Sequence, residues 1–392
     1  MTPKNSSTPS VDVVELATKA RHKLFEACPR VGAVLTLDPA HIGYLTGYRS
    51  TGHDLYRYYQ MAALVSPERV ALVLGAGDGP PASELLPQES LFCYGTFFVE
   101  SIDRAKHWGS AYTSFDAALD AALGSILPEH CLLGLDHTGI PSKDQLTASL
   151  KNWWIEDITA RLLDCRVVKL PGEIELLRHA NRLLERGIAV AFENAKIGVT
   201  ECELAALVAS EIVRGGGMPR SLTVTSGPRT ALVDAPPSQR RLAHGDTLRL
   251  DLDCTYQGYW ADIARTAFIG QATPKQEARF SAISTGLAAE RQAIRPGVSA
   301  GELFRTAVDA TRRAGLPAFD RHNCGHGIGV NSNERPRIVE GNQEILQPGM
   351  VICIETPYYE IEWGGMMTEQ MMLVTENGAE PLTTLDATLR VL

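Results

Sequence analysis

Apolar and polar residues alternate differently in the two halves of the chain. The predicted strands of the first half are short apolar runs at 31–38, 61–66, 69–75 and 131–136, and the predicted helices lie around 12–27, 113–127 and 143–151. Strands that alternate with helices in this way are typical of a layered α/β domain. We therefore expect the N-terminal half to form an α/β domain.

The pattern changes near residues 167–172, where the segment VVKLPGE interrupts it. An amphipathic helix is then predicted from about Glu173 to Ala195. A second helix should begin at Thr200, which can form a capping box with Glu203, and end at the glycines 215–217. Further helices are expected near 274–294 and 299–314, among many strands. We therefore predict two domains, residues 1–168 and 169–392, the second with an α+β fold.

Two acidic residues stand out in the strand-rich segment 248–266, LRLDLDCTYQGYWADIART. Asp251 and Asp262 lie about equally far from a predicted turn at 256–258. In a hairpin they would face each other, with Cβ atoms roughly 5 Å apart. Carboxylates that close repel each other unless a cation lies between them. Asp253 should point to the same face as Asp251, because side chains alternate along a strand.

A second acidic pair follows near the C-terminus. Glu355 ends the apolar run MVICIE, and Glu369 lies in MTEQMMLV, on the far side of a turn within PYYEIEWGG. We expect these two glutamates to meet across a second hairpin. An acidic side chain within an apolar strand is costly unless it is paired or bound to a metal.

His326 lies between glycines in the segment NCGHGIGV, which suits a ligand on a tight connection. Taken alone, an aspartate in a hairpin is more often a solvated residue, and a glycine-flanked histidine more often belongs to a loop. Together, four carboxylates and one imidazole suit divalent Mn, Fe, Co or Zn. Two such ions roughly 3.5–4 Å apart could be bridged by the carboxylates.

Composition narrows the choice of partners and location. The formal net charge is −9 and no Lys/Arg run is longer than a pair, which argues against nucleic acid or an anionic membrane as a partner. The polar N-terminus MTPKNSSTPSVD has no apolar core of the kind found in secretory signals. The eight cysteines show no C-x-x-C pair, so we expect reduced thiols and a cytoplasmic protein.

At these residues the sequence resembles peptidase family M24, the creatinase, prolidase and methionine aminopeptidase family. Its motifs match in order and spacing, namely D-x-x-x-x-x-x-G-Y-x-x-D at 251–262, GHGIG at 325–329, PGMVICIE at 348–355 and the glutamate of MTEQ at 369. HIGYLTGYRS at 41–50 resembles the N-terminal signature of the prolidase-like members. The resemblance implies a creatinase/prolidase-like N-terminal domain before a catalytic domain with the pita-bread fold.

The resemblance also implies roles for the five ligands. Asp251 and Asp262 would hold one divalent ion, His326 and Glu355 the other, and Asp251 and Glu369 would be shared more evenly. Glu355 would act as general base and pass the proton to the leaving nitrogen. The family usually forms homodimers in which the N-terminal domain of one subunit overhangs the site of the other. The segment RSTGHDLYRYY at 49–59 is a candidate for that wall, or else an ordinary exposed loop.

Four positions depart from the family's peptidases. Asn333 and Asp234 stand where two histidines usually help to hold the substrate and the tetrahedral intermediate, and we expect them to take part in catalysis instead. Met367 replaces a common arginine. Asp253 replaces a glycine, and the resulting D-x-D resembles the dimethylsulfoniopropionate lyase branch; alternatively, Asp253 orients His326 or Asn333 without touching a metal.

These observations favour a dinuclear-metal hydrolase of a C–N bond in a dipeptide-like or other small substrate, similar to an Xaa-Pro peptidase. Three alternatives stay open. The first is a metal-dependent lyase, the second an amidine hydrolase like creatinase or ectoine hydrolase, and the third a catalytically silent binding module.

Overall fold

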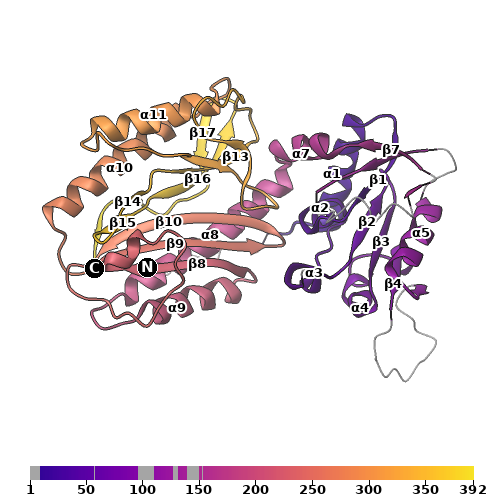
Figure 1. Cartoon of the computed structure of the whole chain (residues 1–392), viewed down its shortest axis with the longest axis horizontal. Coiled ribbons are helices and arrows are strands. Elements are labelled where there is room, and N and C mark those ends of the chain that lie inside the picture. Colours follow the sequence, from indigo (N-terminus) through magenta and orange to yellow (C-terminus); the bar gives the residue numbers. More distant parts are fainter. Residues whose placement is uncertain (1–8, 57, 96–109, 127–130, 139–149, 152) are drawn as a thin grey trace. The chain divides into compact units, whose positions relative to one another are not determined.

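The structure is a computed structural model that describes residues 9–56, 58–95, 110–126, 131–138, 150–151 and 153–392. These residues form two compact units, Ser10–Arg166 and Val167–Leu392, and each unit has its own hydrophobic core (Figure 1).

The first unit is built around a seven-stranded sheet with the order β5-β4-β3-β2-β1-β6-β7. β2 runs antiparallel to β1 and β3, and the other neighbours are parallel. Leu119 and Leu123 of α5 pack against sheet residues such as Leu35 and Val73. The element bounds are α1 Val13–Ala27, β1 Val31–Thr36, α2 Pro39–Thr46, α3 Thr51–Leu55, β2 Ala62–Val65, β3 Val70–Gly75, α4 Gly79–Ala82, β4 Leu91–Tyr94, β5 Ser110–Tyr112, α5 Phe115–Ile126, β6 Leu132–Leu135, β7 Trp154–Asp157 and α7 Thr159–Val167.

The mixed α/β character expected for this half is confirmed. The four predicted strands correspond to β1, β2, β3 and β6, and two of the predicted helices correspond to α1 and α5. The helix expected at 143–151 falls largely outside the described residues.

The second unit contains two main antiparallel sheets, with strand orders β18-β10-β9-β8 and β12-β11-β13-β16-β17, and the small pair β14-β15. β18 is the exception, because it runs parallel to β10. The element bounds are α8 Pro171–Asn194, α9 Glu201–Arg214, β8 Met218–Ser226, β9 Thr247–Tyr256, β10 Tyr259–Phe268, α10 Pro274–Ala293, α11 Ala300–Arg313, β11 Gly325–Gly327, β12 Glu334–Arg337, β13 Val351–Glu355, β14 Tyr358–Glu360, β15 Gly364–Met366, β16 Glu369–Thr375, β17 Gly378–Pro381 and β18 Arg390–Val391.

Helices cover the outer face of each sheet in this unit, as Figure 1 shows. α8 and α9 pack against the sheet of β8, β9 and β10. α10 and α11 cover the other sheet, where Ile283 and Phe304 share a core with Ile352, Ile354 and Met372. The inner faces of the two sheets are therefore left facing each other.

The predicted helix starts are confirmed in detail at α9. The Thr200 side chain accepts a hydrogen bond from the backbone N–H of Glu203 at 3.1 Å, and the Glu203 carboxylate accepts one from the Thr200 N–H at 2.7 Å. This reciprocal pair satisfies two backbone donors that a helix start otherwise leaves without partners. α8, α10 and α11 also begin within two residues of the predicted positions.

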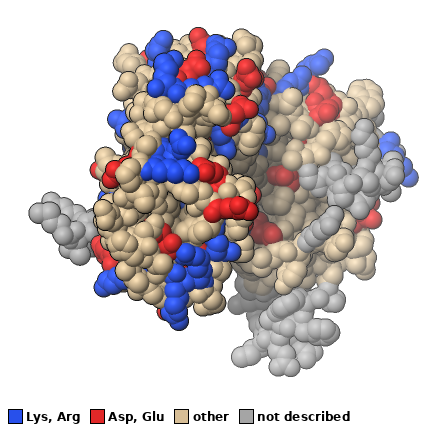
Figure 2. Space-filling view, turned by 60° about the vertical axis from the view of Figure 1, so that its left-hand side comes forward, with Lys and Arg blue, Asp and Glu red and all other residues tan. Residues whose placement is uncertain are grey.

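Charged side chains on the face drawn in Figure 2 form separate basic and acidic groups that are interleaved. The described residues on that face (Figure 2) form no continuous basic surface of the kind that follows a phosphate backbone. Within the described part of the chain, no helix has the length and apolar content needed to cross a membrane.

Candidate metal centre

The first acidic hairpin is formed by β9 and β10. A two-residue turn joins the strands, and both turn residues have positive φ, 49° at Gln257 and 80° at Gly258. The turn pairs Asp262 with Asp253 and places Asp251 opposite Ala264. The expected pairing of Asp251 with Asp262 is therefore wrong, because the hairpin is centred between Gln257 and Gly258, one residue further along the chain than the midpoint between Asp251 and Asp262.

The error in register leaves all three aspartates on one face. Moving a partner by two residues preserves the face, because side chains alternate with a period of two. The other face of β9 carries Leu248, Leu250, Leu252 and Cys254, and the Cys254 thiol donates to the carbonyl of Ala180 in α8 at 3.4 Å. The alternation in LRLDLDC thus sends the apolar side chains toward the helices and the charged ones toward the inner face.

The second acidic pair meets as expected. β13 and β16 are antiparallel neighbours, and Glu355 lies directly opposite Glu369. Glu355 is 8% exposed and Glu369 is 1% exposed. Two carboxyl groups are therefore held side by side in a buried position, which is costly without a compensating cation.

His326 reaches the same sheet from β11, where it lies opposite Cys353 of β13. Its flanking glycines are required by close backbone approaches. A Cβ atom on Gly325 would lie 2.1 Å from the carbonyl oxygen of Cys353, and one on Gly327 would lie 2.1 Å from that of Arg335. The motif GHGIG therefore allows the histidine to sit on a strand packed tightly between two neighbours.

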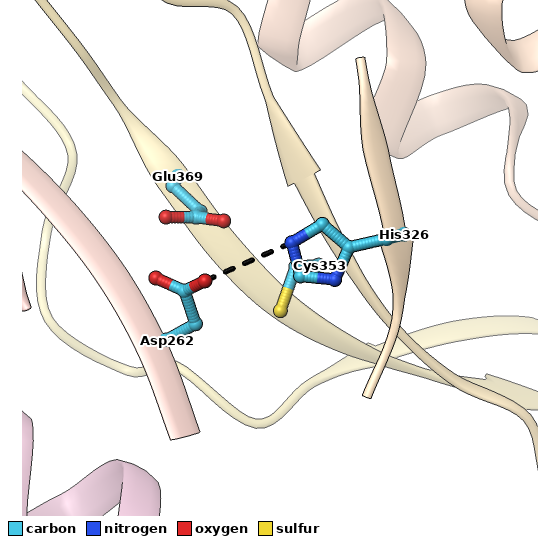
Figure 3. Close-up of side chains that lie close together, drawn as sticks. All are labelled: Asp262, His326, Cys353 and Glu369. Carbon is cyan, nitrogen blue, oxygen red and sulfur yellow. Dashed lines mark ion pairs between the residues drawn. The ribbon is translucent and has the colours of Figure 1, made fainter. Parts of the chain in front are cut away.

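Donor atoms from both sheets converge between the inner faces (Figure 3). Ligand atoms of Asp262, His326, Cys353 and Glu369 all lie within 4.8 Å of one another, and His326 Nε2 lies 3.7 Å from Asp262 Oδ2. The His326 Nδ1 atom is 3.0 Å from the carbonyl oxygen of Gly327. With the proton on Nδ1, the Nε2 lone pair points toward the carboxylates, as metal ligation requires.

Hydrogen bonds from β10 hold the inner faces of the two sheets together beside the ligand cluster. The Thr266 hydroxyl donates to the carbonyl of Met367 and accepts from its N–H, each at 2.9 Å. The guanidinium of the buried Arg265 donates to the carbonyl of Glu369. Thr266 and Arg265 thus fix the approach to Glu369 from the strand that carries Asp262.

The carboxyl groups of the cluster are buried close to one another, which disfavours their charged forms. Burial raises the pKa of Glu369 and Asp262 well above their usual range, and the neighbouring carboxylates raise both further. Burial, with repulsion from Asp251, raises the pKa of Asp253 to about 7, and burial raises that of Glu355 to about 7. Glu369 Oε2 and Asp253 Oδ1 are buried without a hydrogen-bond partner. A divalent cation would supply both the charge and the missing partner.

Burial also lowers the pKa of His326, so the neutral imidazole, the form that binds metals, is favoured. Within the described chain, the donors of this set are carboxylate, imidazole and thiol side chains, which are donor types that bind Zn, Fe and Co.

Arg249 is a part of the site that the sequence analysis missed. It is fully buried on β9, two residues before Asp251, and its guanidinium donates to Asp251 Oδ2 and to the Tyr359 hydroxyl, each at 3.1 Å. It also donates to the carbonyls of Leu232 and Val233. Its position two residues from a proposed ligand was the signal available in the sequence. Arg249 thus anchors Asp251 and adds a permanent positive charge.

The two predicted catalytic residues outside the ligand set lie on exposed segments. Asp234 lines a cavity of about 510 Å³ together with Arg220 and Thr223, and Thr223 pairs with Asp251 across β8 and β9. Burial raises the pKa of Asp251, Arg249 offsets part of the rise, and the charge of Asp234 adds to it. Asn333 is exposed and directly precedes β12.

A larger cavity, of about 1100 Å³, lies on the opposite face of β16. Thr368 and Gln370 line it, together with α10 and part of the segment 381–389. Because alternate residues of β16 point in opposite directions, Glu369 faces away from this cavity. The larger cavity is therefore separate from the ligand cluster.

Comparison with known proteins gives consistent matches. The family model described as metallopeptidase family M24 matches residues 175–376. An Xaa-Pro dipeptidase of Pyrococcus furiosus is 33% identical over 231 residues, which are 58% of this chain and 66% of the relative, just under two thirds of its length. An uncharacterized peptidase of Staphylococcus haemolyticus is 29% identical over 89% of this chain and 93% of its own.

Solved structures extend the match over the whole fold. The prolidase from Pyrococcus furiosus superposes with a TM-score of 0.74 at 25% identity and covers 93% of this chain and 99% of its own. An X-Pro aminopeptidase from Thermotoga maritima gives a TM-score of 0.80 at 22% identity, over 96% of this chain and 99% of its own.

Proposed function

Because this chain belongs to metallopeptidase family M24, we propose that it hydrolyses the C–N bond of dipeptide-like substrates, similar to an Xaa-Pro dipeptidase, with two divalent ions. The family and the pita-bread fold expected from the sequence are confirmed, and membership places the chain among metal-dependent hydrolases. Residues 1–168 would be the N-terminal domain and residues 169–392 the catalytic domain.

The observation that carries this proposal is the convergence of acidic side chains on the inner faces of two sheets. Asp251, Asp262, Glu355 and Glu369 would hold the ions together with His326, whose Nε2 is directed at Asp262. When bound, divalent ions supply a lowered pKa for water and polarisation of the scissile carbonyl. Manganese, iron, cobalt and zinc all accept such donors.

The protein's own acid–base group would be Glu355. Glu355 is 8% exposed and lies directly opposite Glu369, and in the metal-free fold burial raises its pKa to about 7. It would remove the proton from the attacking water and deliver it to the leaving nitrogen. Asp234 and Asn333 would contact the substrate, Asp234 as an acceptor and Asn333 as a hydrogen-bond donor that cannot shuttle a proton.

Metal analysis together with a substrate panel tests this proposal. We expect about two divalent ions per chain and hydrolysis of dipeptides with a C-terminal proline. Asp262→Ala should lose both the ions and the activity, because it removes a carboxylate at the centre of the cluster. Asp309→Ala, which changes an exposed residue of α11, is the matched control. Full metal loading of Asp262→Ala would refute the ligand assignment.

One observation favours a second candidate, a metal-assisted lyase. Asp253 lies directly opposite Asp262 and shares its face, so it is placed to be an additional ligand, as the D-x-D pattern implies for the lyase branch. The same panel distinguishes the two reactions, because an olefinic product would identify elimination and two free amino acids would identify hydrolysis.

Assembly and location are further proposals. We propose that the chain works as a cytoplasmic homodimer in which the segment 49–59 of one subunit borders the site of the other. Leu55 and Tyr56 in this segment are 67% and 66% exposed, and Tyr58 is 88% exposed, which supports a role in contact with another chain. Light scattering of the purified protein would test the dimer, and monomers with full activity would refute it.

A further inference from the structure

Cys353 shares the sheet face that carries the proposed ligands. It lies two residues before Glu355 on β13, so the two side chains point in the same direction. Its neighbour across the β11 pair is His326, and its neighbour across the β16 pair is Met371. The backbone alone therefore places the thiol next to the imidazole and diagonally next to Glu369.

The distances agree with this placement. The Cys353 sulfur belongs to the set of ligand atoms, with those of Asp262, His326 and Glu369, that lie within 4.8 Å of one another. In a tetrahedral zinc site, bonds of about 2.3 Å to sulfur and about 2.0 Å to nitrogen or oxygen place neighbouring donors about 3.3–3.5 Å apart. The His326 Nε2 to Asp262 Oδ2 distance is already 3.7 Å. In Figure 3 the sulfur points into the space beside Asp262 and His326.

The surroundings of Cys353 differ from those of an ordinary buried thiol. Most buried cysteines act as small apolar side chains. Cys254 does so here, because it faces α8 and donates to a helix carbonyl. Cys353 is equally buried but shares its set of neighbouring donor atoms with Asp262 and Glu369, and the Oε2 atom of Glu369 is buried without a hydrogen-bond partner. The Cys353 sulfur is therefore placed where a cation held by these carboxylates could also bind it.

We propose that Cys353 is a thiolate ligand of the metal centre, beside His326, Asp262 and Glu369. This inference rests on the proposed function, since it assumes that the centre binds divalent metal. A soft thiolate donor favours zinc, cobalt or iron over manganese. With the Cys353 sulfur as a ligand, this centre should prefer zinc, cobalt or iron to manganese more strongly than a site of carboxylates and imidazole alone.

Cobalt(II) substitution of the full-length protein tests the assignment without relying on activity. We expect the cobalt form to show a thiolate-to-cobalt charge-transfer band in addition to its d–d bands. Cys353→Ala should remove the charge-transfer band and weaken zinc binding relative to manganese by about tenfold or more. Cys254→Ala is the matched control, because it removes the same atoms from a buried strand position that faces a helix.

The outcomes separate this inference from the proposed function. Bound cobalt with d–d bands and no charge-transfer band would overturn the thiolate assignment and leave the metallohydrolase proposal standing. A charge-transfer band that survives Cys353→Ala would also overturn it. Failure of the wild-type protein to bind cobalt, zinc or manganese would overturn both. If the variant folds poorly, the wild-type spectrum decides the question alone.

Discussion

Removing the metal should make the stability of this protein fall as the pH rises. Glu355 is 8% exposed, and burial raises its pKa from an ordinary value of 4.5 to about 7 in the metal-free fold. In the unfolded chain the carboxyl group is exposed and ionises at its ordinary value. Between these two pKa values the folded protein holds a proton that the unfolded chain releases, so raising the pH favours unfolding.

The magnitude follows from the shift. One pKa unit corresponds to about 1.4 kcal/mol, so Glu355 alone contributes about 3 kcal/mol, fully present below the unfolded pKa and lost as the pH rises through about 7. Between about pH 5 and about pH 8 the loss should be about 2.5 kcal/mol. Asp253 acts in the same direction, because its pKa is also raised to about 7. For a domain stable by about 5–15 kcal/mol, this loss is readily measured.

The assay is denaturant unfolding of the chelated protein at several pH values, with and without saturating zinc. Metal should reverse the trend, because it binds the ionised carboxylates and gains affinity as the pH rises. Glu355→Gln should flatten the pH dependence of the metal-free protein, and Glu340→Gln, at an exposed position, should not. Metal-free stability that stays constant or rises between about pH 5 and about pH 8 would refute the reasoning.

Two further predictions concern residues beside the ligands. Arg249→Met should destabilise the metal-loaded protein by about 3 kcal/mol in denaturant unfolding, since it strips a buried partner from Asp251 and from two carbonyls, and an unchanged unfolding midpoint would contradict this. Asn333→His should raise kcat/KM for Xaa-Pro dipeptides by about tenfold or more, because imidazole can transfer a proton and an amide cannot; no gain would show that the position does not limit the reaction.

The sequence predicted the face of each acidic strand more reliably than the register. Glu355 and Glu369 were paired correctly because they lie symmetrically about their connection. Asp251 and Asp262 were paired wrongly because Gln257 and Gly258 both adopt positive φ and form a two-residue turn, which no count of residues could fix in advance. The face was still right, since the true partner, Asp253, lies two residues from the expected one.

Other parts of the site depend on distances that a linear pattern does not contain. Alternation along β9 and β13 puts Arg249 and Cys353 on the ligand faces, but it does not say what those faces meet. The two sheets pack against each other through hydrogen bonds of Thr266 and Arg265. Only this packing shows that Arg249 contacts Asp251 and Tyr359 and that Cys353 lies among the ligand atoms. Asp234 and Asn333 lie outside the regular strands, where periodicity gives no information about position.

The charges of Arg249, Asp253 and Cys353 all enter the charge balance of the proposed metal centre. Asp251, Asp253, Asp262, Glu355 and Glu369 carry five negative charges when ionised, and Arg249 offsets one, which leaves a charge that two divalent ions would neutralise. A Cys353 thiolate adds one more negative charge. Asp253 lies directly opposite Asp262, and in the metal-free fold burial and repulsion from Asp251 raise its pKa to about 7. A single proton shared by the Asp253 and Asp262 carboxyl groups would keep the centre neutral, so Arg249, Asp253 and Cys353 are best understood as one set of mutually dependent residues.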